Sequence, residues 1–206
     1  MKKAIIYIHG KGGNADESKR YEGLCQGYDV YGLDYKGSTP WGTKEEFQNA
    51  YDEIAEKYNE IVIIANSIGA YFTMNALANK KISKALFISP IVDMEKLILD
   101  MMVWEGTDEQ ELLKKGKITT NFGETLSWEY LEYVRNSPIV WNVPTEILYA
   151  GNDNLTSIET VTAFADAHNA TLLIMPNGEH WFHTEEQLAF LDKWIMDVLN
   201  DTEMII

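Results

Sequence analysis

The chain has 206 residues, 46% of them hydrophobic and 24% charged, which predicts one globular domain with a sizeable core. Its formal net charge of −15 at pH 7 argues against nucleic acid as a partner, because phosphate binding needs a basic surface. The sequence contains no run of about 18 apolar residues, so we expect no membrane span, and its lone cysteine, Cys25, excludes an internal disulfide and favours a reducing, cytoplasmic location.

The first part of the chain alternates strand-like and helix-like segments, as in a parallel sheet with helices on both faces. Residues 4–8 are a short apolar run. We interpret this run as a first strand rather than a signal peptide, because it contains Tyr7 and lacks a small-residue cleavage site. The next expected elements are a glycine-rich loop at 9–14, a helix at 17–26, a strand at 29–33, a loop at 34–42, and a helix opened by the capping-box pair Thr43 and Glu46.

The segment IVIIANSIGA at residues 61–70 carries the strongest pattern. Its β-branched apolar start predicts a strand buried on both faces of a parallel sheet, and a tight turn and a helix at 70–78 follow. A serine at such a sharp turn is held above the sheet with a strained backbone and an exposed hydroxyl. The adjacent helix N-terminus offers N–H groups and a positive dipole end to a developing oxyanion, so Ser67 is a candidate nucleophile.

A fourth strand at 85–88 ends at Ser89, and the alternation then stops between residues 91 and 144. We interpret residues 91–144 as a helical lid insertion over one end of the sheet, within a single domain that spans 1–206. The elements expected in it are a helix at 94–104, a helix capped by Thr107 and Gln110, a hairpin at 117–127 and a helix that starts at Ser127. The elements expected after it are strands at 146–150 and 171–175 and helices at 157–168 and 184–199.

A serine nucleophile needs a base to remove its proton and a third group to orient that base. The loop GNDN after the strand at 146–150 supplies Asp153, and the loop PNGEHWF after the strand at 171–175 supplies His180. Both loops follow strand ends, which is where ligands gather in open parallel sheets. The chain order Ser67, Asp153, His180 therefore predicts one site at this edge of the sheet.

These residues resemble the motifs of the α/β-hydrolase family, over essentially the whole chain. The motifs are HGKG at 9–12, NSIG at 66–69, Asp153 and His180, with Ala65 in place of the first glycine of the family's G-x-S-x-G pattern. The resemblance implies a three-layer αβα sandwich with a mostly parallel six-stranded sheet in the order 2-1-3-4-5-6. The antiparallel strands with which the family usually begins are missing.

The resemblance also implies how the site residues act. Ser67 is the expected nucleophile, His180 the general base and acid, and Asp153 the group that orients His180. The backbone N–H groups of Lys11 and Ile68 are the expected oxyanion hole. The implied activity is that of a small serine hydrolase, similar to a carboxylesterase, acting on a small carboxylic ester through an acyl-enzyme without metal or organic cofactor. An acyltransferase, thioesterase or aminopeptidase on the same residues remains an alternative, as does a non-catalytic binding protein.

Several residues have a second interpretation. Ser67 is also a suitable helix cap, and His183 competes with His180 as the base. The pair His180 and His183 is not a convincing metal site, because no carboxylate or cysteine lies at matching spacing. Candidate substrate contacts are His9, whose alternative role is to shape its loop, and the aromatic residues Trp104 and Trp181.

Overall fold

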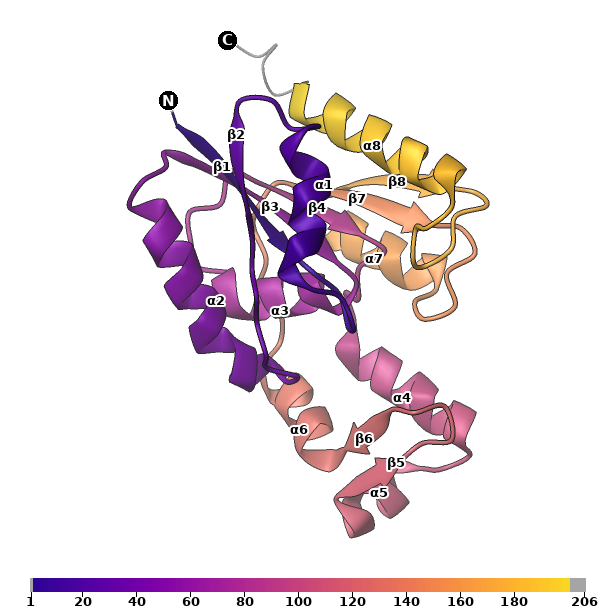
Figure 1. Ribbon diagram of the computed structural model, residues 1–206. Coiled ribbons are helices and arrows are strands. Elements are labelled where there is room, and N and C mark those ends of the chain that lie inside the picture. Colours follow the sequence, from indigo (N-terminus) through magenta and orange to yellow (C-terminus); the bar gives the residue numbers. More distant parts are fainter. Residues whose placement is uncertain (1, 201–206) are drawn as a thin grey trace. The chain divides into compact units, whose positions relative to one another are not determined.

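Short runs of β-branched and other apolar residues form the main sheet in the computed structural model, which describes residues 2–200 (Figure 1). Its six strands lie in the order β2-β1-β3-β4-β7-β8, and every neighbouring pair is parallel. This order confirms the predicted 2-1-3-4-5-6 when only the strands of the main sheet are counted. The strands are β1 Lys3–Ile8, β2 Tyr28–Gly32, β3 Glu60–Asn66, β4 Lys84–Ile88, β7 Thr145–Ala150 and β8 Thr171–Met175.

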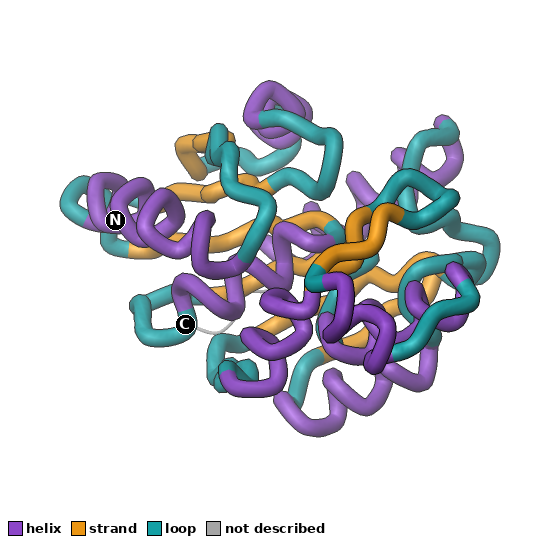
Figure 2. The backbone as a smooth tube through the Cα atoms, turned by 90° about the horizontal axis from the view of Figure 1, so that it is seen from below, coloured by secondary structure: helices purple, strands orange, loops and turns teal. Residues whose placement is uncertain are grey.

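Helices cover both faces of this sheet, which gives the predicted three layers (Figures 1 and 2). On one face, strand residues such as Ile5 and Ile64 share a buried cluster with Tyr21, Trp194 and Ile195 of the flanking helices. On the other face, Phe47 and Phe72 pack edge to face with ring centroids 6.4 Å apart. The helical elements of the first face are the 3₁₀ turn η1 Ala15–Ser18, α1 Lys19–Glu22 and α8 Glu185–Asn200, and those of the second are α2 Pro40–Ala55, α3 Ile68–Leu77 and α7 Ile158–His168.

Two helix starts and one helix length were predicted wrongly. The helix α2 begins at Pro40 rather than at Thr43, because the Thr39 hydroxyl accepts a hydrogen bond from Gly42 N and proline suits the first helical position. The helix expected at 17–26 is instead η1 followed by the short α1, which ends at Gly23. In α5, the cap is Asp108 rather than Thr107, since its carboxylate accepts from Glu111 N at 2.8 Å.

Residues 93–139 form a second compact unit. Arg135 joins three of its helices through hydrogen bonds of 2.7–2.8 Å to Glu95 and Glu109. The flanks of the predicted insertion belong to the first unit, where Trp141 packs on Phe87 with ring centroids 5.7 Å apart. That this second unit acts as a lid stays a prediction. Its elements are α4 Met94–Glu105, α5 Glu109–Lys115, the antiparallel hairpin β5 Lys117–Thr119 and β6 Thr125–Ser127, and α6 Trp128–Asn136.

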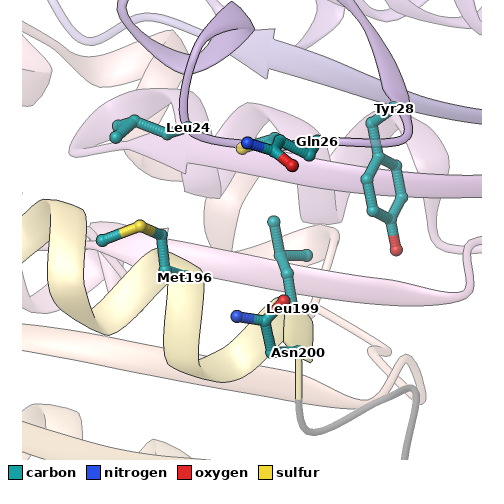
Figure 3. A pocket seen from close by; sticks show the side chains of 7 residues that line it. Leu24, Gln26, Tyr28, Met196, Leu199 and Asn200 are labelled. Carbon is teal, nitrogen blue, oxygen red and sulfur yellow. The ribbon is translucent and has the colours of Figure 1, made fainter.

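Among residues 2–200, we find no helix with the length and apolar character needed to cross a membrane. A pocket of about 240 Å³ lies beside the start of β2 and the end of α8 (Figure 3). Since Tyr28 begins β2, this pocket is at the amino edge of the sheet, opposite the edge where Ser67, Asp153 and His180 follow their strands. Its lining residues are Leu24, Cys25, Gln26, Tyr28, Met196, Leu199 and Asn200.

A buried thiol and a buried phenol in the core predict that the fold loses stability at alkaline pH. Burial raises the pKa of the Cys25 thiol from 9.0 to about 11 and that of Tyr149 from 10.0 to about 12. Above about pH 9 the unfolded chain releases protons that the folded chain retains, so the free energy of unfolding falls as pH rises. We expect a lower urea midpoint, followed by tryptophan fluorescence, at about pH 10.5 than at about pH 8. A Cys25→Ala variant should show a smaller drop, and equal midpoints at both pH values would contradict this account.

Candidate active site

The turn between β3 and α3 consists of Ser67 alone, in a conformation that side chains rarely adopt. Its φ is 53° and its ψ is −122°, and a positive φ is uncommon for any residue other than glycine. Three backbone hydrogen bonds hold it there. Ser67 N donates to Ile88 O at 3.0 Å, and Ser67 O accepts from Ala70 N and Ile91 N, both at 3.1 Å. Its hydroxyl makes no capping hydrogen bond to α3, so the helix-cap interpretation is wrong.

Two glycines allow the first loop to lie against this turn. A Cβ added to Gly69 would lie 2.5 Å from the carbonyl oxygen of His9, so only glycine lets α3 approach the end of β1 this closely. A Cβ added to Gly10 would lie 3.2 Å from the Cβ of Ser67. The loop that follows β1 therefore packs directly on the serine turn.

Asp153 and His180 lie on two loops that are hydrogen-bonded to each other. Asn152 N donates to Gly178 O at 2.8 Å, which ties the loop after β7 to the loop after β8. The Asp153 side chain is fully buried, and its Oδ1 accepts hydrogen bonds from the N–H groups of Leu155 at 2.8 Å and Thr156 at 3.1 Å. These two bonds fix the carboxylate so that Oδ2 faces the imidazole.

The three predicted side chains meet in one hydrogen-bonded row. His180 Nδ1 lies 2.7 Å from Asp153 Oδ2, and His180 Nε2 lies 2.8 Å from Ser67 Oγ. Because an ionised carboxylate only accepts hydrogen bonds, Nδ1 carries the imidazole proton and donates it to Asp153. The Nε2 atom is then the acceptor, and it lies in position to receive a proton from the Ser67 hydroxyl.

The two expected oxyanion donors lie on the segments that flank Ser67. Ile68 is the first residue of α3, where backbone N–H groups have no acceptor within the helix. Lys11 lies in the turn that the hydrogen bond from Gly13 N to Gly10 O closes at 3.2 Å. That the N–H groups of Lys11 and Ile68 bind an oxyanion stays a prediction.

The predicted substrate contacts have different surroundings. The buried His9 ring stacks on Tyr35 with centroids 4.2 Å apart, and its Nδ1 donates to Gly10 O at 2.8 Å. Trp181, next to His180, is 74% exposed, and Trp104 of the second unit packs on Phe122. Contact of His9, Trp104 and Trp181 with substrate stays a prediction.

The sequence did not single out Tyr35, because the loop at 34–42 is predicted from composition alone and composition gives no role to a single residue. Its hydroxyl donates to His9 O at 2.8 Å, so together with the stacked ring it fixes the start of the glycine-rich loop. The signal that could have found it is an aromatic residue in the loop that follows β2, the strand that neighbours β1.

His183 lies outside the hydrogen-bonded row of Ser67, His180 and Asp153. Its Nδ1 donates to Trp181 O at 2.8 Å and lies 3.3 Å from Glu179 Oε2, on the exposed side of the loop. For the ester hydrolysis predicted from the sequence, we expect His183→Ala to change kcat/KM by less than about threefold and His180→Ala to remove nearly all activity. Initial-rate measurements on both variants check this, and a His183→Ala enzyme as inactive as His180→Ala would reverse the choice of base.

Comparisons with known proteins rest on structure alone, since no family model and no curated protein matches the chain. α/β-Hydrolase domain-containing protein 10 from mouse is 15% identical with a TM-score of 0.77, over 97% of this chain and 90% of that chain. Est1E from Butyrivibrio proteoclasticus is 17% identical with a TM-score of 0.73, over 97% and 87%. A monoacylglycerol lipase from Paleococcus ferrophilus is 15% identical with a TM-score of 0.64, over 95% and 93%.

Proposed function

The chain has the α/β-hydrolase fold, and on this basis we propose that it is a serine hydrolase that cleaves a small carboxylic ester through an acyl-enzyme. The observation that carries the proposal is the row of contacts from Asp153 Oδ2 to His180 Nδ1 at 2.7 Å and from His180 Nε2 to Ser67 Oγ at 2.8 Å. The burial of Asp153 supports it further, because a buried carboxylate with fixed partners orients the imidazole without competition from water.

In the first half of the reaction, Ser67 Oγ attacks the ester carbonyl carbon while His180 Nε2 takes its proton. The carbonyl oxygen becomes an oxyanion, which the N–H groups of Lys11 and Ile68 receive. Each such donor is worth about 2.7–4 kcal/mol of transition-state stabilisation. His180 then returns the proton to the leaving alcohol, and the acyl group remains on Ser67.

In the second half, a water molecule replaces the alcohol and gives its proton to His180 as it attacks the acyl-enzyme. Collapse of the second tetrahedral intermediate releases the carboxylic acid and restores the Ser67 hydroxyl. Asp153 stabilises the imidazolium in both halves. Every step uses these side chains, backbone donors and water, so the proposal includes no metal or organic cofactor.

A small, uncharged ester is the substrate class that we favour. The net charge of −15 disfavours polyanionic substrates. Two of the similar structures are Est1E from Butyrivibrio proteoclasticus with bound ferulic acid and a monoacylglycerol lipase. The lipase is named for an ester substrate, which is the bond type that we propose.

A fluorophosphonate probe provides the test. We expect it to form an adduct on Ser67 of the wild-type protein, located by peptide mass spectrometry, and no adduct on Ser67→Ala. Ser38→Ala, which removes an exposed loop serine, is the matched control and should label like wild type. A parallel screen with p-nitrophenyl esters of increasing chain length should show hydrolysis that the probe abolishes. Labelling at another residue, or no labelling of folded protein, would overturn the proposal.

A further inference from the structure

The Tyr7 hydroxyl lies where three segments around Ser67 meet. Tyr7 belongs to β1, its ring is buried against Tyr21 with centroids 5.2 Å apart, and the glycine-rich loop starts two residues later. Its hydroxyl donates a hydrogen bond of 2.6 Å to Glu17 Oε2. Such a short bond to a carboxylate is a strong one, so the two side chains are held together firmly.

Glu17 in turn holds the far end of the glycine-rich loop. Its Oε1 accepts a hydrogen bond from Asn14 N at 3.2 Å. A Cβ added to Gly13 would lie 2.6 Å from the same oxygen, so the carboxylate rests against the loop backbone. Gly13 N donates to Gly10 O, and Lys11 lies within the turn that this bond closes. Glu17 therefore fixes the turn that carries the Lys11 N–H.

Asn66, beside Ser67, lies on the face of the sheet that carries Tyr7. Tyr7 pairs with Ile64 in the sheet, and alternate strand residues share a face, so Asn66 lies on the same face as Tyr7. Burial raises the pKa of Tyr7 above its ordinary range. The hydroxyl therefore keeps its proton and donates it to Glu17.

The Asn66 amide beside Ser67 carries a cost in stability. Asn66 Oδ1 is buried and has no hydrogen-bond partner within the described part of the chain. A buried acceptor without a partner costs about 1–3 kcal/mol. An apolar residue at this position would avoid that cost but would also lose the amide beside Ser67.

We infer that Tyr7 is a positioning residue whose hydroxyl, through Glu17, fixes the loop carrying the Lys11 N–H against β1, the strand that pairs with β3 before the serine turn. This inference rests on the proposed function. An oxyanion hole works only when its donors lie about 2.7–3.1 Å from the oxyanion. The hydrogen bonds from Tyr7 to Glu17 and from Asn14 N to Glu17 hold the loop with one donor against β1, and β1 pairs with the strand that leads to the other donor.

The test replaces Tyr7 with phenylalanine, which keeps the buried ring and removes the hydroxyl. We expect kcat for an ester to fall about tenfold or more while KM changes by less than about twofold, because oxyanion contacts form mainly in the transition state. Affinity for a trifluoromethyl ketone, which forms a tetrahedral adduct with serine, should fall by the same factor. Tyr28→Phe is the matched control, since Tyr28 donates to Glu60 Oε1 at 2.8 Å at the opposite edge of the sheet. It should keep wild-type kinetics.

A second pair of variants covers the case in which Tyr7→Phe does not fold. In Glu17→Gln the amide oxygen can accept from Asn14 N while the NH₂ group donates to the Tyr7 hydroxyl, so most of the activity should remain. Glu17→Ala should show the loss expected for Tyr7→Phe. If the wild-type protein hydrolyses no ester, the proposed function fails and the inference falls with it. If the wild type is active and Tyr7→Phe and Glu17→Ala match Tyr28→Phe in kcat and in inhibitor affinity, the inference alone is wrong.

Discussion

Replacing Ser67 with alanine is expected to lower kcat for ester hydrolysis by about 10⁶-fold, because the covalent route through the acyl-enzyme is lost. The fold should survive, since the backbone hydrogen bonds of Ser67 to Ile88, Ala70 and Ile91 do not involve its hydroxyl. Initial rates at high enzyme concentration and the thermal midpoint of unfolding measure the two effects separately.

The double variant Ser67→Ala/His180→Ala sharpens this test. When two residues take part in the same catalytic step, removing the second has little effect on the rate once the first is gone. The double variant should therefore be no slower than Ser67→Ala alone. The contact of 2.8 Å between Ser67 Oγ and His180 Nε2 is the physical reason to expect such coupling. Losses that multiply, or more than about one per cent residual activity in Ser67→Ala, would show that the two residues work independently.

Asp153→Asn is expected to lower kcat by about 10⁴-fold with little change in stability. The reason lies in the two oxygens of Asp153. Oδ1 accepts from Leu155 N and Thr156 N, and only the amide oxygen of asparagine can take its place. The amide NH₂ group then faces His180 Nδ1, which must become an acceptor. The imidazole proton moves to Nε2, and that nitrogen can no longer take the proton of Ser67.

Steady-state kinetics with circular dichroism as a folding check measure the effect of Asp153→Asn. Asp34→Asn is a suitable control, because Asp34 is an exposed loop aspartate whose carboxylate pairs with Lys36 at 2.7 Å. Its activity should equal that of the wild type. If Asp153→Asn kept full activity, another residue would have to orient His180.

The sheet and the serine turn could be predicted because local patterns encode them. The run at 61–64 is β-branched and buried on both faces, so few alternatives to a central strand exist. The placement of Asp153 and His180 followed from topology, because both come directly after strands of one parallel sheet. For these residues the chain order and the strand pattern were enough to expect a common edge.

Other features depend on contacts that no local pattern records. The stacking of His9 on Tyr35 joins residues 26 positions apart. The choice between His180 and His183 is decided by which imidazole reaches Ser67, not by the residues beside them. The start of α2 was missed because Trp41 and Gly42 have a loop-like composition, while the Thr39 cap and Pro40 impose a helix on them.

The left-handed backbone at residue 67 has a consequence for how such a chain evolves. Glycine adopts this conformation without the cost of about 1–3 kcal/mol that other residues bear. Under the proposed function, mutation from serine to glycine here would end hydrolysis and stabilise the fold at the same time. A lineage freed from selection for hydrolysis should drift toward glycine at this site, so serine in descendant chains would mark continued selection on catalysis.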